Sequence, residues 1–120
     1  MNLEKEVQEY MKDKNKSMIT ANTYQIEAKK TAIFPANKAL EYLSLGLVGE
    51  AGEVANKVKK IIRDKKIDVD IANEIGDVLW YCAMLADYLD VNLGKIMEDN
   101  INKLQSRKER GVLGGSGDNR

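Results

Sequence analysis

Two pairs of acidic residues interrupt apolar segments of this sequence at helical spacing. The first pair is Glu50 and Glu53 in "GEAGEV", and the second is Glu74 and Asp77 in "EIGD". Residues three apart lie on the same side of a helix, so each pair would present its two carboxylates together. A carboxylate on a core-facing stripe is strongly unfavourable unless it is paired or neutralised. A hard divalent cation such as Mg²⁺, which takes oxygen ligands, would neutralise four such groups.

A purely structural interpretation of the same acids is also open. They could lie on a solvated boundary and form ion pairs with Lys57, Lys59 or Lys60. A single E-x-x-E in a helix usually has that explanation, because surface ion pairs at this spacing are common. Two pairs, each interrupting an apolar stripe, favour the metal site instead.

A third group of residues is suited to an anion. Asn100, Lys103, Arg107 and Arg110 recur at intervals of three, four and three, so a helix would place them on one face. An amide and three cations in a row suit phosphate oxygens. The alternative is a solvated basic end that is favoured by the helix dipole. Cations near an acidic metal cluster indicate phosphoryl chemistry.

Four helices are predicted to position these residues, because apolar residues recur every three or four positions and breakers are few. They cover about 23–34, 38–64, 71–88 and 94–110, and residues 1–14 form a short amphipathic helix or a frayed arm. The expected N-terminal caps are Thr20 or Asn22, then Asn37, then Asp68 or Asp70.

Each predicted helix has an apolar face. The buried positions are expected to be Leu40, Leu43, Leu47, Val54, Val58 and Ile61, then Ile71, Ile75, Val78, Cys82, Leu85 and Leu89, and finally Met97, Ile101 and Leu104. Glycine destabilises a helix, so Gly49, Gly52 and Gly76 predict either a close approach of two helices or room for a ligand. These helices predict an all-α, antiparallel four- to five-helix bundle.

Composition narrows the possible functions. The chain has 120 residues with 19 basic and 19 acidic side chains, no histidine, and Cys82 as its one cysteine. The balanced charge argues against binding polymeric nucleic acid. Without histidine, a Ser-His-Asp triad, a Cys-His pair and the usual Glu-x-x-His redox-metal site are excluded. A lone cysteine fits a reducing cytoplasm, and no apolar segment is long enough for a membrane.

The segments "GLVGEAGEVANKVKK", "NEIGDVLWYCAMLADYL" and "NINKLQSRKERG" together resemble the MazG-like branch of the all-α nucleoside triphosphate pyrophosphohydrolases. That superfamily is marked by E-x-x-E, a spacer, and then E-x-x-D. The resemblance covers roughly residues 20–118, within one domain that spans 1–120. That domain divides into an N-terminal arm (1–19), a helical core (20–110) and a Gly-rich tail (111–120).

The resemblance implies a function and roles for residues. Members convert a (d)NTP and water to a (d)NMP and pyrophosphate with Mg²⁺, for which Mn²⁺ can substitute. By this resemblance the metal ligands would be Glu50, Glu53, Glu74 and Asp77, and Glu50 or Glu53 would also orient or deprotonate the attacking water. By the resemblance, the residues expected to bind substrate are Asn100 and Lys103, which match the family's N-x-x-K, together with Arg107 and Arg110. Tyr81 follows Asp77 by one helical turn, so it is expected either to stack on the base of the substrate or to pack in the core or an interface.

Family members form homodimers or homotetramers, so a homo-oligomer with sites near its interfaces is expected. The tail is expected to fold over a bound nucleotide or a neighbouring subunit, or to be disordered. The expected role is sanitation or regulation of the cytoplasmic nucleotide pool. The alternative is a non-catalytic helical module that binds a nucleotide or a partner.

Overall fold

The computed structural model describes residues 2–12, 17–66 and 70–120, and every regular element within them is a helix. The predicted all-α class is therefore confirmed. The elements are α1 (Leu3–Lys12), α2 (Ala21–Lys29), the 3₁₀ turn η1 (Ala36–Lys38), α3 (Ala39–Asp64), α4 (Ile71–Tyr88) and α5 (Leu93–Glu109).

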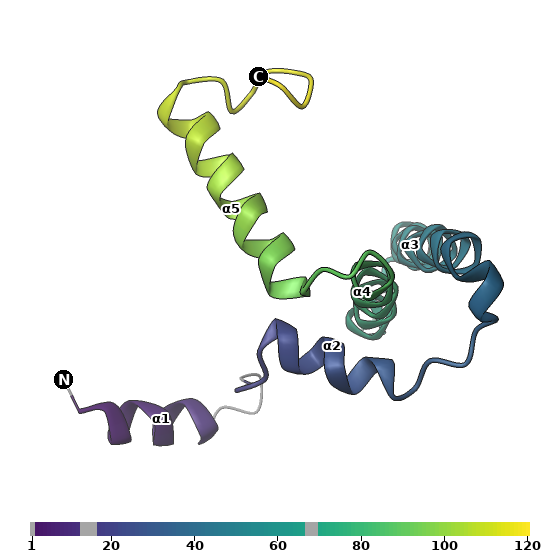
Figure 1. The fold of residues 1–120 in the computed structure, drawn as a ribbon, viewed down its shortest axis with the longest axis horizontal. Helices are drawn as coiled ribbons and strands as arrows, with labels where there is room; N and C mark the ends of the chain where they lie inside the picture. Colours follow the sequence, from purple (N-terminus) through teal and green to yellow (C-terminus); the bar gives the residue numbers. More distant parts are fainter. Residues whose placement is uncertain (1, 13–16, 67–69) are drawn as a thin grey trace.

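Helices α3 and α4 form the main helix pair, and α2 crosses α4 on another side (Figure 1). The buried core lies where α2, α3, α4 and the start of α5 meet, and consists of Ala28, Leu43, Ala83, Met84, Ala86 and Leu93. Aromatic side chains of Tyr24, Phe34, Trp80 and Tyr81 pack against it. Because α3 and α4 pack along each other, acids in the middle of one helix can face acids on the other.

Helix α2 is shorter than its sequence pattern predicts. Thr20 caps it as expected, since its Oγ1 accepts a hydrogen bond from the Thr23 amide at 3.1 Å. The helix ends at Lys29 instead of continuing to Phe34. At that end the Thr31 hydroxyl donates to the Ala28 carbonyl at 2.7 Å, a side-chain bond that competes with further helical bonding.

The other predicted caps are only partly correct. Asn37 lies inside η1, and Lys38 precedes α3 without a side-chain capping bond, so the prediction for Asn37 is wrong. Asp70 does precede α4, but its side chain makes no capping bond, and Asp68 falls outside the described residues. Helix α3 ends as predicted at Asp64.

The buried face of α4 is turned relative to the prediction. Its fully buried residues are Ala83, Met84 and Ala86, because α4 packs against both α2 and α3 and small side chains fit between them. Cys82 is half-buried. On α3 and around α4, four residues predicted on buried faces are exposed: Leu40, Val58, Ile75 and Leu89.

Helix α5 departs most from the prediction. Leu93 at its start is buried, but Met97, Ile101 and Leu104 are 53%, 52% and 37% exposed, so their predicted burial is wrong. The reason is that α5 projects away from α3 and α4 (Figure 1). The radius of gyration is 18.0 Å, whereas a compact chain of this length would have about 13.6 Å. The chain is therefore less compact than that, and both α1 and α5 extend from the core of α2, α3 and α4 (Figure 1).

Candidate functional site

Three of the four predicted acids converge across the α3–α4 pair. Glu50 comes from α3, while Glu74 and Asp77 lie one turn apart on α4. Each of the three can place a carboxylate oxygen within 4.8 Å of those of the other two. Glu50 and Glu74 are half-buried and Asp77 is exposed, so the cluster opens to solvent at one side.

The negative charges of the three carboxylates are only partly balanced by nearby cations. Burial raises the pKa of the Glu50 carboxyl, and the negative charges of Asp77 and then Glu74 raise it further. The Lys57 ammonium lies 3.9 Å from a Glu74 carboxylate oxygen and 3.9 Å from one of Asp70, which is a loose pairing. Three carboxylates at this separation fit a hard divalent cation, which takes oxygen ligands and opposes their repulsion.

Glu53 occupies a different position from the other three acids. Its side chain is exposed, and it is not part of the group whose oxygens converge. Its charge still contributes to the raised pKa of Glu50, after the larger effects of Asp77 and Glu74. Its role as a metal ligand stays a prediction.

The close approach of helices occurs at a glycine other than those predicted. A Cβ atom on Gly49, Gly52 or Gly76 would meet nothing within 4 Å, so these residues leave open space beside the acids. A Cβ atom on Gly46 would instead overlap the ring of Tyr81. Gly46 therefore allows the Tyr81 ring to lie directly against the backbone of α3.

A hollow of about 310 Å³ adjoins the acidic cluster and is lined by Thr31, Glu50, Asp77, Trp80 and Tyr81. Trp80 is fixed in it, because its Nε1 donates to the Thr31 hydroxyl at 2.8 Å. The rings of Trp80 and Tyr81 meet edge to face at a centroid separation of 5.0 Å. The hollow thus combines carboxylates on one side with aromatic surface on another.

The predicted phosphate-binding residues are not brought to this hollow within one chain. Asn100 and Lys103 line a different hollow on α5, of about 290 Å³, with Ile96 and Asp99. Arg107 and Arg110 bind the chain's own tail instead: their Nη2 atoms donate to the carbonyl oxygens of Asp118 at 3.0 Å and Arg120 at 2.8 Å.

The tail folds back on the end of α5. Arg107 is buried beneath it, and Arg120 donates to the Val112 carbonyl at 3.1 Å and to the Leu113 carbonyl at 3.3 Å. The tail residues Gly111–Arg120 therefore pack against the C-terminal end of α5 of the same chain.

The sequence pattern assigned no site role to Thr31 or Trp80. It did indicate Lys57 as a possible ion-pair partner of the acids, and the structure pairs Lys57 with Glu74. Thr31 had no sequence signal, because it reaches the hollow only through the early end of α2 and the hydrogen bond from Trp80.

Among the described residues, no helix combines the length and hydrophobicity that crossing a membrane requires.

Comparisons with known proteins agree with the resemblance. Residues 38–112 match the model of the MazG nucleotide pyrophosphohydrolase domain. The chain is 54% identical over 109 residues to the "Gene 37 protein" of Mycobacterium phage L5, and the match covers 81% of this chain and 96% of that protein. No solved structure matches the chain significantly.

Proposed function

Because the chain belongs to the family of MazG nucleotide pyrophosphohydrolase domains, we propose that it hydrolyses nucleoside or deoxynucleoside triphosphates to monophosphates and pyrophosphate. The observation that carries the proposal is the convergence of Glu50, Glu74 and Asp77 beside an aromatic-lined hollow. One end of this site suits a metal and phosphates, and the other suits a nucleobase.

The metal is proposed to be Mg²⁺, with Mn²⁺ as a substitute. Glu50, Glu74 and Asp77 would hold it, and Glu53 would join them after a change of its side-chain rotamer. When bound, the ion offsets negative charge on the phosphate oxygens. The fit rests on the donor set, which consists of oxygen ligands that leave charge to be neutralised.

The reaction requires a base for the attacking water. Water attacks the α-phosphorus, the bond from that phosphorus to the bridging oxygen breaks, and pyrophosphate leaves. Glu50 is our candidate to accept the water's proton, because its carboxylate lies between the acidic cluster and the adjoining hollow, where the reacting phosphate would lie. Glu53 is the alternative base.

The nucleobase is proposed to lie in the hollow of Thr31, Trp80 and Tyr81. A volume of about 310 Å³ is near the lower end for small-molecule pockets, which suits a single base better than a whole nucleotide. Tyr81 would present ring surface for stacking, and Trp80, held by Thr31, would form a wall.

A second copy of the chain is proposed to supply the phosphate-binding face of α5. The exposed apolar residues support association: Leu45 and Val48 on α3 are 74% and 72% exposed, and Met97 and Ile101 on α5 exceed 50%. A homodimer or homotetramer would cover these surfaces. It would also bring Asn100 and Lys103 of one copy towards the acids of another.

The biological role proposed is control of the cytoplasmic nucleotide pool. A chain that cleaves triphosphates to monophosphates removes the substrates of polymerases, whether those nucleotides are canonical or damaged.

The proposal is tested by measuring pyrophosphate release from a panel of canonical and damaged NTPs and dNTPs with Mg²⁺, Mn²⁺ or EDTA. We expect equal amounts of pyrophosphate and monophosphate with metal, and none with EDTA. A Glu98→Gln variant, which removes an exposed acid on α5, serves as the control and keeps its activity. Release of orthophosphate, or no release from any nucleotide by the folded protein, would contradict the proposal.

A further inference from the structure

The start of α5 is capped by side chains of another helix. The first amides of any helix lack partners within that helix. Asn92 precedes α5 but makes no side-chain capping bond. Instead the Leu93 amide donates to Oε1 of Gln25 at 2.9 Å, and the Gly94 amide donates to Oδ1 of Asn22 at 2.9 Å. Both acceptors belong to α2, so α2 supplies the cap that α5 does not make itself.

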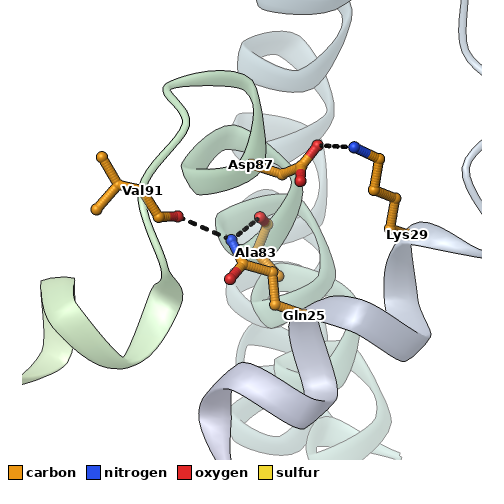
Figure 2. Close-up of polar contacts among 5 residues, drawn as sticks. All are labelled: Gln25, Lys29, Ala83, Asp87 and Val91. Atoms are coloured by element: carbon orange, nitrogen blue, oxygen red, sulfur yellow. Dashed lines mark hydrogen bonds and ion pairs between the residues drawn. The ribbon is translucent and has the colours of Figure 1, made fainter.

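Gln25 connects three parts of the fold through one amide group. Its Nε2 donates to the carbonyl oxygen of Ala83 on α4 at 3.2 Å and to that of Val91 at 3.0 Å, just before α5 (Figure 2). The side chain is 7% exposed, so these bonds form out of water. The oxygen and the nitrogen of this buried amide are both hydrogen-bonded, so its orientation is fixed, because any rotation would leave a buried polar group without a partner.

Gly94 makes the second cap possible. A Cβ atom at this position would lie 2.8 Å from Oδ1 of Asn22, closer than such atoms normally approach. An alanine there would displace the Asn22 side chain from the Gly94 amide. Asn22 can therefore cap α5 because residue 94 is a glycine.

Among the described residues, the body of α5 makes few contacts that could hold its direction. Every residue from 95 to 106 is exposed, and the helix contacts only α2 and α4 among the described elements. Leu93 is buried and anchors the helix, but apolar contact is not directional. The hydrogen bonds of Asn22 and Gln25 are directional, so they can fix an angle. The bond from the Val91 amide to the Ala86 carbonyl at 2.9 Å holds the turn before α5.

We propose that Asn22 and Gln25 are positioning residues that set the direction of α5 and, through it, the location of Asn100 and Lys103. Lys103 lies ten residues beyond Leu93, or about 15 Å along the helix. A tilt of about 10° at the cap would move it by about 2.6 Å. Displacements of that size are large compared with what nucleotide contacts tolerate. The functional half of this inference rests on the proposed function, whereas the structural half does not.

The structural half is tested without any activity measurement. Spin labels on cysteines introduced at the exposed Lys59 and Gln105, in a Cys82→Ala background, report the α3–α5 distance by pulsed electron paramagnetic resonance. Labelled chains are diluted with unlabelled ones so that only distances within a chain are seen. We expect Asn22→Ala to broaden or shift the distribution by about 2–3 Å, as the tilt above implies.

Three further variants sharpen this measurement. Asn22→Asp keeps the acceptor and adds a charge favourable to a helix N-terminus, so it should preserve the parent distribution. Gly94→Ala should reproduce the effect of Asn22→Ala. Glu27→Ala, which removes an exposed α2 side chain bonded to Lys30, should change nothing. A distribution that is the same in Asn22→Ala and in the parent would overturn the proposal, whatever reaction the protein catalyses.

The functional half is tested by a double-mutant cycle. Asn22→Ala alone should raise KM about tenfold with a smaller change in kcat, and Asn22→Asp should restore it. In a background that carries both Asn100→Ala and Lys103→Ala, Asn22→Ala should add less than twofold, because the two residues it positions are already gone. Full additivity of the changes would show that the cap does not act through these two residues, and would overturn this half.

Discussion

The α3–α4 pair and helix α5 carry the two halves of the candidate chemistry, and they are held in contrasting ways. Glu50, Glu74 and Asp77 converge because two long helices pack along each other, and many contacts fix their separation. Asn100 and Lys103 lie on a helix whose body is exposed and whose direction depends on its first turn. The acidic half is thus assembled within one chain, while the cationic half is presented outward, which suits it to meet a second copy.

The largest effect is expected from the acidic half. Asp77→Asn or Glu74→Gln should lower kcat by about a thousandfold, because each removes a ligand charge next to the reacting phosphate. Helix content measured by circular dichroism should not change. In EDTA either variant should melt at a higher temperature than the parent, since repulsion within the cluster falls. Full activity in either variant would remove these residues from the site.

Substitutions on α5 should change the KM for nucleotide more than kcat. Lys103→Ala should raise the KM for nucleotide about tenfold and leave the melting temperature unchanged, because the side chain is exposed and its loss removes only a substrate contact. Lys108→Ala, an exposed lysine near the end of the same helix, is the matched control and should have little effect. Equal KM values in the parent and Lys103→Ala would mean that α5 does not contribute to the site.

The same contrast explains what the sequence could predict. The acids were recognisable because residues three apart share a helix face whatever surrounds the helix. Of the predicted apolar stripe on α3, only Leu43 is fully buried. The burial of Met97, Ile101 and Leu104 was predicted wrongly by the same logic. Periodicity identifies an apolar face but not what covers it, and no part of the chain that the structure describes covers this face of α5.

Contacts between distant segments had no sequence signal. The bond from Trp80 to Thr31 joins residues 49 positions apart, and that from Leu93 to Gln25 joins residues 68 apart. Both depend on where α2 ends and how it crosses α4. The glycines illustrate the same limit: Gly49, Gly52 and Gly76 stood beside the acids in sequence, but Gly46 is the one against which a ring packs.

Gly46 offers a smaller test, confined to the acidic half. Gly46→Ala would force Tyr81 away from α3, so we expect a loss of about 1–3 kcal/mol in the free energy of unfolding and weaker nucleotide binding. Gly49→Ala is the matched control on the same helix, where a methyl group meets open space. There the better helix propensity of alanine should raise stability by up to about 1 kcal/mol. Urea denaturation of both variants measures the difference, and equal losses would mean that Gly46 has no special contact.

The smallest expected effect is the pH dependence of the metal-free acidic cluster. Burial, Asp77 and Glu74 raise the pKa of Glu50 above its ordinary value of 4.5, so the folded chain binds this proton more tightly than the unfolded chain. The unfavourable contribution of Glu50 to the free energy of unfolding is therefore fully present above the pKa of the folded chain. It is relieved as pH falls through that value towards 4.5.

In EDTA, Glu50→Gln should melt above the parent at pH 7.5, and the difference in melting temperature should shrink as pH is lowered. With Mg²⁺ the order at pH 7.5 should reverse, because the parent then gains a bound ion that the variant holds weakly. A similar pH series on Lys103→Ala should follow the parent throughout, since α5 takes no part in the cluster. If the melting temperatures of Glu50→Gln and the parent differed by the same amount at every pH and with or without metal, the effect of Glu50 would not come from the charge of its carboxylate.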